Sequence, residues 1–157
     1  MNACARAAVC LAALLALGGC SSWQKTWEDI RGGSIDRRPY ATLEGTRWLL
    51  NSAMLRSGPV LPPDPQRYWI EFQPEHRLLV RADCNRGLGA WKADADSLSI
   101  GSVSYTRAVC EVSSVGAEFS AALETARNWY LRDGSLFLEL TTEGRVLRFN
   151  LADPAAR

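Results

Sequence analysis

From residue 43 onward, the chain consists of short runs in which apolar and polar residues alternate. The runs 68–72 and 77–83 place apolar side chains at every second position, which is the period of a half-buried β-strand. A turn at 73–76 joins them, so we predict a hairpin. Residues 46–51, 88–92 and 98–100 predict further strands. The segment 57–65 carries four prolines and predicts a loop, because proline removes backbone donors that a central strand needs.

A single stretch shows helical spacing instead. Its apolar stripe comprises Val115, Phe119, Ala122, Leu123 and Ala126, with Ser113 or Ser114 available as the N-cap. The segments 128–132, 135–141 and 145–151 then predict three closing strands, joined by the turn dipeptides at 133–134 and 143–144. Together these elements predict an α+β domain. We expect an antiparallel, strongly curled sheet or partial barrel of about eight short strands, with one helix packed across it.

The first 20 residues have a different character. Residues 7–17 form an uncharged apolar run that is too short to span a bilayer and has the layout of a secretory signal peptide. The sequence Leu17-Gly-Gly-Cys20 resembles the bacterial lipoprotein signal. That resemblance implies cleavage after residue 19, acylation of Cys20 and a membrane anchor through the N-terminal lipid. Because Ser21 stands where an inner-membrane retention Asp would sit, it also implies a lipid-anchored protein on the periplasm-facing side of the outer membrane.

Residues 20–42 are predicted to be the lipidated Cys and a tether, because they mix charges with Gly and Pro and lack a sustained period. Trp23, Trp27 and Ile30 have helical spacing and would face the lipid headgroups if a short helix formed there. The alternative is that they pack on the domain or stay disordered. Residues 43–151 form the predicted domain, and 152–157 a C-terminal tail.

The charge balance argues against a nucleic-acid partner. The whole chain has 18 Lys and Arg against 17 Asp and Glu. Removal of the leader takes away Arg6 and leaves 17 against 17, so no bulk positive charge is available to bind phosphates.

Cysteine use follows from the compartment. Cys4 and Cys10 leave with the leader and Cys20 takes lipid, so Cys84 and Cys110 remain as a pair in an oxidising compartment. We predict a disulfide between them, worth about 3 to 4 kcal/mol by loop entropy. Two buried free thiols are the alternative, and a redox pair is disfavoured because Cys-x-x-Cys spacing is missing. The two sulfurs and the single histidine, His76, are too few for a metal site, and we expect no cofactor.

Several motifs occur in an order that resembles the META domain family of heat-inducible bacterial lipoproteins. They are Leu43-Glu-Gly-Thr-Arg-Trp48, Cys84-Asn-Arg-Gly-Leu-Gly-Ala-Trp91, Thr106-Arg-Ala-Val-Cys110, Glu118-Phe119 with Ala122-Leu123, and Leu136-Phe-Leu-Glu-Leu140. The chain departs from the family pattern at Asp83, where a Gly is common. The resemblance implies a small α+β envelope domain linked to heat or antibiotic stress, with no established enzymatic activity. In its barrel build it is similar to the lipid-binding pilot lipoproteins of secretion systems.

Three motif residues have polar side chains that could bind a ligand, and they are candidates for a shared binding surface: Asn85, Arg86 and Thr106. Asn85 suits a turn or left-handed conformation, and Gly87 and Gly89 allow tight geometry after it. The guanidinium of Arg86 either bonds loop carbonyls or offers a fork to a carboxylate or phosphate. Thr106 is expected to tie a loop to the backbone.

An enzyme is not predicted. His76 is the sole imidazole, and an extended strand between it and Cys84 keeps the two apart, so they cannot form a dyad. Two non-catalytic functions remain. The first is a binding or scaffold module that engages an envelope protein through exposed aromatics such as Trp69, Trp91 or Trp129, although core packing is expected for at least half of them. The second is a carrier of an acyl chain or other apolar ligand in a cavity lined by Ile70, Val80 and Leu138.

Overall fold

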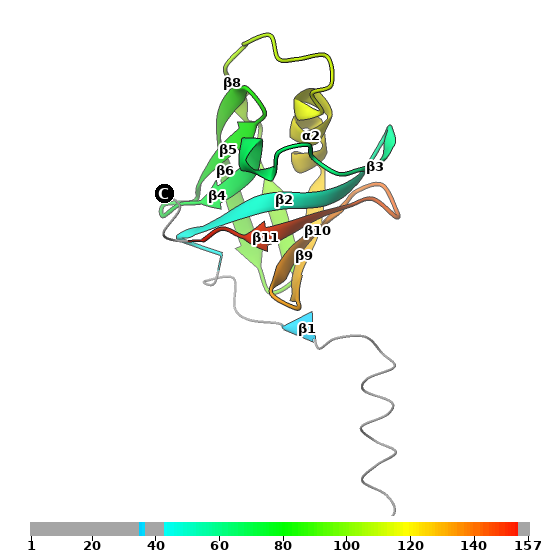
Figure 1. The fold of residues 1–157 in the computed structure, drawn as a ribbon. Coiled ribbons are helices and arrows are strands. Elements are labelled where there is room, and N and C mark those ends of the chain that lie inside the picture. The colour runs from blue at the N-terminus through cyan, green and yellow to red at the C-terminus, as the bar shows by residue number, and fades with distance from the viewer. Residues whose placement is uncertain (1–34, 37–42, 154–157) are drawn as a thin grey trace, which may run out of the picture. The chain divides into compact units, whose positions relative to one another are not determined.

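The alternating runs form strands that wind into a closed antiparallel barrel (Figure 1). The computed structural model describes residues 35–36 and 43–153. The strands are β1 (Ile35–Asp36), β2 (Thr46–Leu55), β3 (Gly58–Val60), β4 (Tyr68–Phe72), β5 (Arg77–Ala82), β6 (Asn85–Asp94), β7 (Ser97–Ile100), β8 (Ser104–Tyr105), β9 (Ala126–Arg132), β10 (Ser135–Leu140) and β11 (Val146–Leu151). A 3-10 turn (Pro65–Arg67) and the helix α2 (Gly116–Leu123) complete the described elements.

The barrel has the strand order β9-β10-β11-β2-β4-β5-β6-β7, and it closes because β7 also pairs with β9 at Ser97 and Asn128. The short strands β1, β3 and β8 pair with β9, β2 and β6 respectively. Closure removes the free edges that an open sheet would expose. The predicted α+β class, with a curled sheet of about eight strands and one helix, is confirmed.

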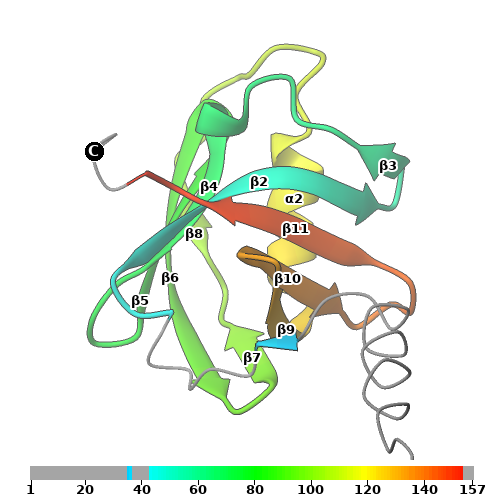
Figure 2. The same ribbon diagram turned by 60° about the horizontal axis from the view of Figure 1, so that its bottom comes forward.

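The core lies inside the barrel and is built by the period of two along each strand. In β4 and β5 every second residue is buried, and Ile70 and Val80 face each other across the pair. The helix α2 packs against β2 and β5 and buries Phe119 and Leu123 completely. The Phe119 ring contacts Tyr68 edge-on with a centroid distance of 6.0 Å. In the second view α2 lies behind β2 and β11 (Figure 2).

The turn dipeptides behave as predicted. Asp133 and Gly134 adopt positive φ angles of 50° and 72° between β9 and β10, and Gly144 adopts 73° between β10 and β11. The β4–β5 hairpin turns through Glu75 and His76, both at φ 59°. Positive φ at two central residues matches the right-handed twist of the strands that such turns connect.

Two sequence predictions are wrong in detail. The segment 57–65 is not all loop, because β3 pairs with β2 and Pro59 lies on this short strand, where a missing N–H is tolerated. The helix ends at Leu123, so Ala126 is not part of its stripe but begins β9 as a buried residue.

The helix start also differs from the prediction. Neither Ser113 nor Ser114 is the N-cap; Val115 occupies that position and makes no side-chain cap bond. The Ser114 hydroxyl still accepts a hydrogen bond from the Gly116 N–H at 3.1 Å. Gly116 is required by close packing, since a Cβ there would lie 2.8 Å from the Ala82 carbonyl oxygen.

Part of the predicted tether is described. Ile35–Asp36 forms β1 and pairs with β9 opposite Arg132 and Leu131, so this segment joins the sheet. Cys20, Trp23, Trp27 and Ile30 lie outside the described residues.

Candidate functional site

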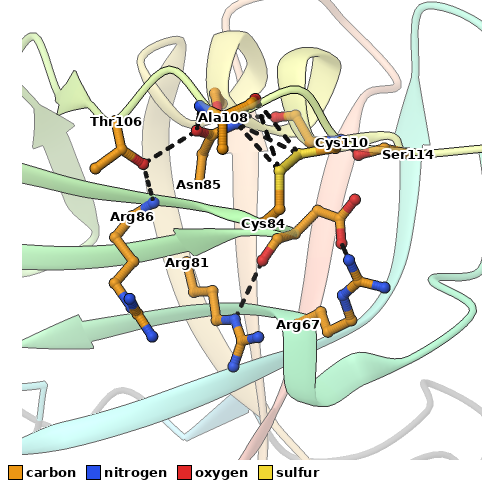
Figure 3. Close-up of a disulfide and its surroundings, with 12 residues drawn as sticks. Arg67, Arg81, Cys84, Asn85, Arg86, Thr106, Ala108, Cys110 and Ser114 are labelled. Carbon is orange, nitrogen blue, oxygen red and sulfur yellow. Dashed lines mark hydrogen bonds and ion pairs between the residues drawn. A yellow bond between two sulfur atoms is a disulfide. The ribbon is translucent and has the colours of Figure 1, made fainter. Parts of the chain in front are cut away.

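The predicted disulfide is present and joins the end of the β5–β6 turn to the loop before α2 (Figure 3). Cys84 and Cys110 have a Cα–Cα distance of 5.6 Å, which lies within the usual range for disulfides. The bridge spans 26 positions of sequence. It therefore holds a long loop against the barrel at the place where the family motif lies.

Asn85 uses both ends of its amide to shape this loop. Its Nδ2 donates to the Ala108 carbonyl at 3.1 Å, and its Oδ1 accepts from the Ala108 N–H at 2.8 Å. Oδ1 also accepts from the Thr106 hydroxyl at 3.0 Å. The side chain acts as a clamp between the loop and β6, so its polar atoms are already bonded within the protein.

Thr106 and Arg86 continue the same attachment. The Thr106 Oγ1 accepts from the Arg86 N–H at 3.0 Å, and the Thr106 N–H donates to the Arg86 carbonyl at 2.9 Å. Thr106 thus ties the loop to the strand. The Arg86 side chain is exposed and points away from the disulfide, so it does not bond the loop carbonyls (Figure 3).

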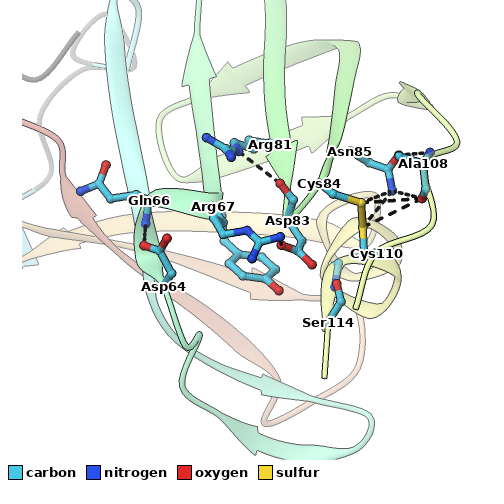
Figure 4. Close-up of polar contacts among 12 residues, drawn as sticks. Asp64, Gln66, Arg67, Arg81, Asp83, Cys84, Asn85, Ala108, Cys110 and Ser114 are labelled. Carbon is cyan, nitrogen blue, oxygen red and sulfur yellow. Dashed lines mark hydrogen bonds and ion pairs between the residues drawn. A yellow bond between two sulfur atoms is a disulfide. The ribbon is translucent and has the colours of Figure 1, made fainter. Parts of the chain in front are cut away.

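The left-handed residue of this corner is Asp83, not Asn85. Asp83 has φ 62° and is almost fully buried, and its carboxylate forms an ion pair with Arg67 (Figure 4). Its N–H donates to the Arg67 carbonyl at 2.7 Å, and its carbonyl accepts from Arg81 Nε at 3.1 Å. Asp tolerates this conformation better than most residues. Asp83 therefore forms the left-handed corner and also holds Arg67.

Gly87 and Gly89 serve close packing rather than a turn. Both lie inside β6, and a Cβ at Gly87 would stand 2.5 Å from the Tyr105 ring and 2.6 Å from Val103. A Cβ at Gly89 would stand 2.8 Å from Val103. The two glycines therefore let the segment containing β8 cross tightly over β6.

A shallow groove of about 340 Å³ opens beside the disulfide. Its lining includes Asn85, Tyr105, Ser114 and Ser120. Burial raises the pKa of the Tyr105 hydroxyl above 10.0, with the nearby Ser120 opposing and Glu124 adding to the shift. The Tyr105 hydroxyl therefore keeps its proton at neutral pH.

The tryptophans divide between core and surface. Trp91 and Trp129 are 3% exposed and pack in the core, which agrees with the expectation that at least half of the three candidates are core residues. Their indole N–H groups donate to the carbonyls of Gln73 and Asp94. Trp69 instead lies half-buried on the outer face of β4, with the Arg47 guanidinium 4.4 Å above its ring.

A second aromatic group lies on the outer face of β9 and β10, and the sequence analysis missed it. Tyr130 and Phe137 are direct cross-strand partners whose rings stack at 4.9 Å. Arg132 lies 5.3 Å from the Tyr130 ring and Arg148 lies 5.6 Å from the Phe137 ring. We call these four residues the aromatic–arginine cluster. Only the strand register brings them together, although Tyr130 and Phe137 occupy outward positions of two predicted strands.

The aromatic–arginine cluster borders a groove of about 410 Å³ whose lining includes Tyr130, Phe137, Glu139 and Val146. A third groove, of about 280 Å³, lies between α2 and the β10–β11 turn, and Glu118 and Arg145 line it. The Glu118 carboxylate accepts hydrogen bonds from the Ser57 N–H and hydroxyl at 2.7 and 2.8 Å.

Within residues 35–36 and 43–153, no group of three or more His, Cys, Asp or Glu side chains is placed to hold a metal ion. His76 packs edge-on against Trp91 with a centroid distance of 5.6 Å. No helix in this part of the chain is long and apolar enough to cross a membrane.

Comparison with known proteins gives the family. The model of the META domain matches residues 41–154. The chain belongs to the META domain family. In this chain the segments Cys84–Arg86 and Thr106–Cys110 form the disulfide corner with its Asn85 clamp. A comparison with curated proteins gives no match.

Solved structures share the fold of this META domain. An NMR structure of a protein from Burkholderia xenovorans is 18% identical and superposes with a TM-score of 0.61, covering 76% of this chain and 93% of its own. A second protein solved by NMR is 24% identical, with a TM-score of 0.54 and coverage of 72% and 94%. A crystal structure of a DUF4847 family protein from Bacteroides vulgatus is 16% identical, with a TM-score of 0.51 and coverage of 72% and 98%.

Proposed function

We propose that this META-domain chain is an outer-membrane lipoprotein, anchored through acylated Cys20 and facing the periplasm. We further propose that its barrel is a non-catalytic binding or scaffold module in envelope stress tolerance, against heat or antibiotics. The lipoprotein-like sequence before Cys20 supports the anchor. Membership of the META family supports an envelope-associated domain.

The aromatic–arginine cluster is the observation that carries the binding role. Tyr and Arg are enriched among the residues that dominate protein–protein binding energy. The stacked Tyr130–Phe137 pair lies on the outer face of β9 and β10 and is flanked by Arg132 and Arg148, which suits a partner with apolar and acidic groups. The adjacent groove gives such a partner a recess.

The family motif supports a structural rather than catalytic reading. The Asn85 amide and the Thr106 hydroxyl hold the disulfide loop. A catalytic group needs a reactive atom free to meet a substrate. In the motif these atoms are committed to the fold.

The carrier function has less support. Ile70, Val80 and Leu138, which would line its cavity, are at most 1% exposed and belong to one hydrophobic core cluster. The three grooves described above are lined by other residues. An acyl chain could enter only if these core side chains moved apart.

Complementation in cells that lack the chain tests the binding role. The full chain with its own leader should restore survival of heat or antibiotic stress. Tyr130→Ala/Phe137→Ala should fail to restore it, despite equal protein levels and an unchanged melting curve. The control Leu61→Ala removes an apolar side chain that is 76% exposed in the loop after β3, and it should restore survival fully. Full rescue by the double variant would overturn the assignment of binding to the aromatic–arginine cluster.

A further inference from the structure

The outer surface of β4, β5 and β6 carries a mixture of cations and large apolar side chains. By the alternation of each strand, Trp69, Arg77, Arg81, Arg86, Leu88 and Lys92 all point away from the core. We call these six residues the basic face. Leu88 lies in the middle of β6 and is 53% exposed.

The cations of the basic face are poorly neutralised within the protein. Arg81 and Arg86 are direct cross-strand partners on one face, and Figure 3 shows both side chains extending in the same direction. Like charges in this arrangement repel. The nearby carboxylates are committed elsewhere, since Glu71 pairs with Arg47 and Asp83 pairs with Arg67. No described carboxylate forms an ion pair with the four cations of the basic face.

The composition and shape of the basic face fit a surface better than a small ligand. Its residues line none of the three grooves described above. The face is the outside of a barrel, and it presents Trp69 and Leu88 among guanidinium and ammonium groups. Trp and Leu partition into the headgroup and upper acyl region of a bilayer, while Arg and Lys pair with lipid phosphates.

We propose that the basic face docks the barrel onto an anionic phospholipid surface. The proposal depends on the proposed anchor at Cys20 in one respect, because the anchor brings the domain near a bilayer. In the strand order, β5 lies four strands from β10 in either direction around the ring. Docking through β5 therefore turns the aromatic–arginine cluster, on β9 and β10, away from the membrane and toward partners in the periplasm.

The test uses the mature protein with vesicles of phosphatidylcholine, with and without brominated phosphatidylglycerol, which quenches tryptophan on contact. Trp48, Trp91 and Trp129 are buried, so Trp69 is the described indole able to meet lipid. The difference in quenching between the parent protein and Trp69→Phe measures the contact of Trp69 with lipid, because all other tryptophans are the same in both chains. We expect this difference in anionic vesicles at low salt and its loss at high salt.

A matched pair of charge variants tests the cations. Arg77→Gln/Arg86→Gln removes two exposed charges of the basic face, and Arg56→Gln/Arg127→Gln removes two exposed charges from other elements. Each basic residue beside an anionic surface contributes a factor of about five to binding, so the first variant should weaken docking about 25-fold. The control should leave docking unchanged. Equal quenching in the parent and Trp69→Phe, or equal loss in the two charge variants, would overturn the proposal.

Sedimentation separates this outcome from failure of the anchor. An acylated chain pellets with neutral vesicles whether or not the basic face docks. A chain without the anchor stays in the supernatant with neutral vesicles. It then pellets with anionic vesicles only if the basic face binds them, so absence from that pellet would overturn the proposal as well.

Discussion

Removal of the disulfide should cost the domain a large share of its stability. The Cys84–Cys110 bridge closes a loop spanning 26 positions of sequence. In the chain-entropy description, opening a loop of that length restores freedom to the unfolded chain worth about 3.5 kcal/mol at 25 °C. Typical domains have only about 5–15 kcal/mol to lose. The Asn85 bonds to Ala108 do not depend on the sulfurs, so the loop should keep its attachment in the folded state.

The variant is Cys84→Ser/Cys110→Ser, which leaves no unpaired thiol at the corner. Urea unfolding followed by circular dichroism should show a free energy of unfolding lowered by about 3.5 kcal/mol, with the curve shifted to a lower midpoint. Reductant should destabilise the parent by a similar amount and leave the variant unchanged. A loss below about 1 kcal/mol would refute the reasoning, because the loop would then be restrained as strongly without the bridge.

Three further predictions concern single positions. Asp83→Gly and Asp83→Ala both remove the carboxylate that pairs with Arg67, but only Ala is strained at φ 62°. Urea unfolding should therefore show Asp83→Ala to be less stable than Asp83→Gly by about 1 kcal/mol. Equal stability of the two variants would contradict the left-handed conformation at this corner. Gly87→Ala places a Cβ 2.5 Å from the Tyr105 ring and should lower the free energy of unfolding by about 1–3 kcal/mol. In the control Gly101→Ala, the nearest atom to the new Cβ is the Ala90 carbonyl oxygen at 3.7 Å, so this variant should be close to neutral in the same assay. Burial would raise the pKa of Glu118, but the bonds from Ser57 and the backbone and charge of Arg56 outweigh it and hold this pKa below 4.5. The ionised Glu118 carboxylate therefore stabilises the folded state above pH 4.5, and this stabilisation is lost as the pH falls below 4.5. Glu118→Gln should remove this part of the pH dependence of thermal unfolding. Identical pH profiles for the parent and the variant would contradict the prediction.

The parts of the fold that the sequence predicted are those with local causes. Alternation of apolar residues in 68–72 and 77–83 reflects burial of one strand face, and the Asp133-Gly134 turn reflects the positive φ that these residues accept. The disulfide also followed from the sequence, because the predicted cleavage and acylation leave only Cys84 and Cys110 to pair.

The features that were missed depend on contacts between distant segments. Pro59 excludes a central strand but not the short strand β3, and only its pairing with β2 shows this. Gly87 and Gly89 looked like turn residues, yet their role is set by Val103 and Tyr105 crossing over β6. The same holds for Tyr130 and Phe137, which are seven positions apart in sequence and meet only through the β9–β10 register.

The sequence identified the residues of the candidate site better than it predicted their arrangement in space. Asn85 and Thr106 lie together at the corner and bond the loop. Arg86, by contrast, lies on the outer face of β6 and not at the corner, because alternation along the strand turns its side chain outward. The left-handed conformation falls on Asp83, whose Arg67 partner comes from before β4 and cannot be read from local sequence.

Intact mass spectrometry of the protein purified from cell membranes tests the central claim most directly, because both the anchored binding module and its docking place the domain at a bilayer. The account predicts a chain that begins at Cys20 and carries added acyl mass. An unprocessed chain, or one cleaved without acylation, would contradict it.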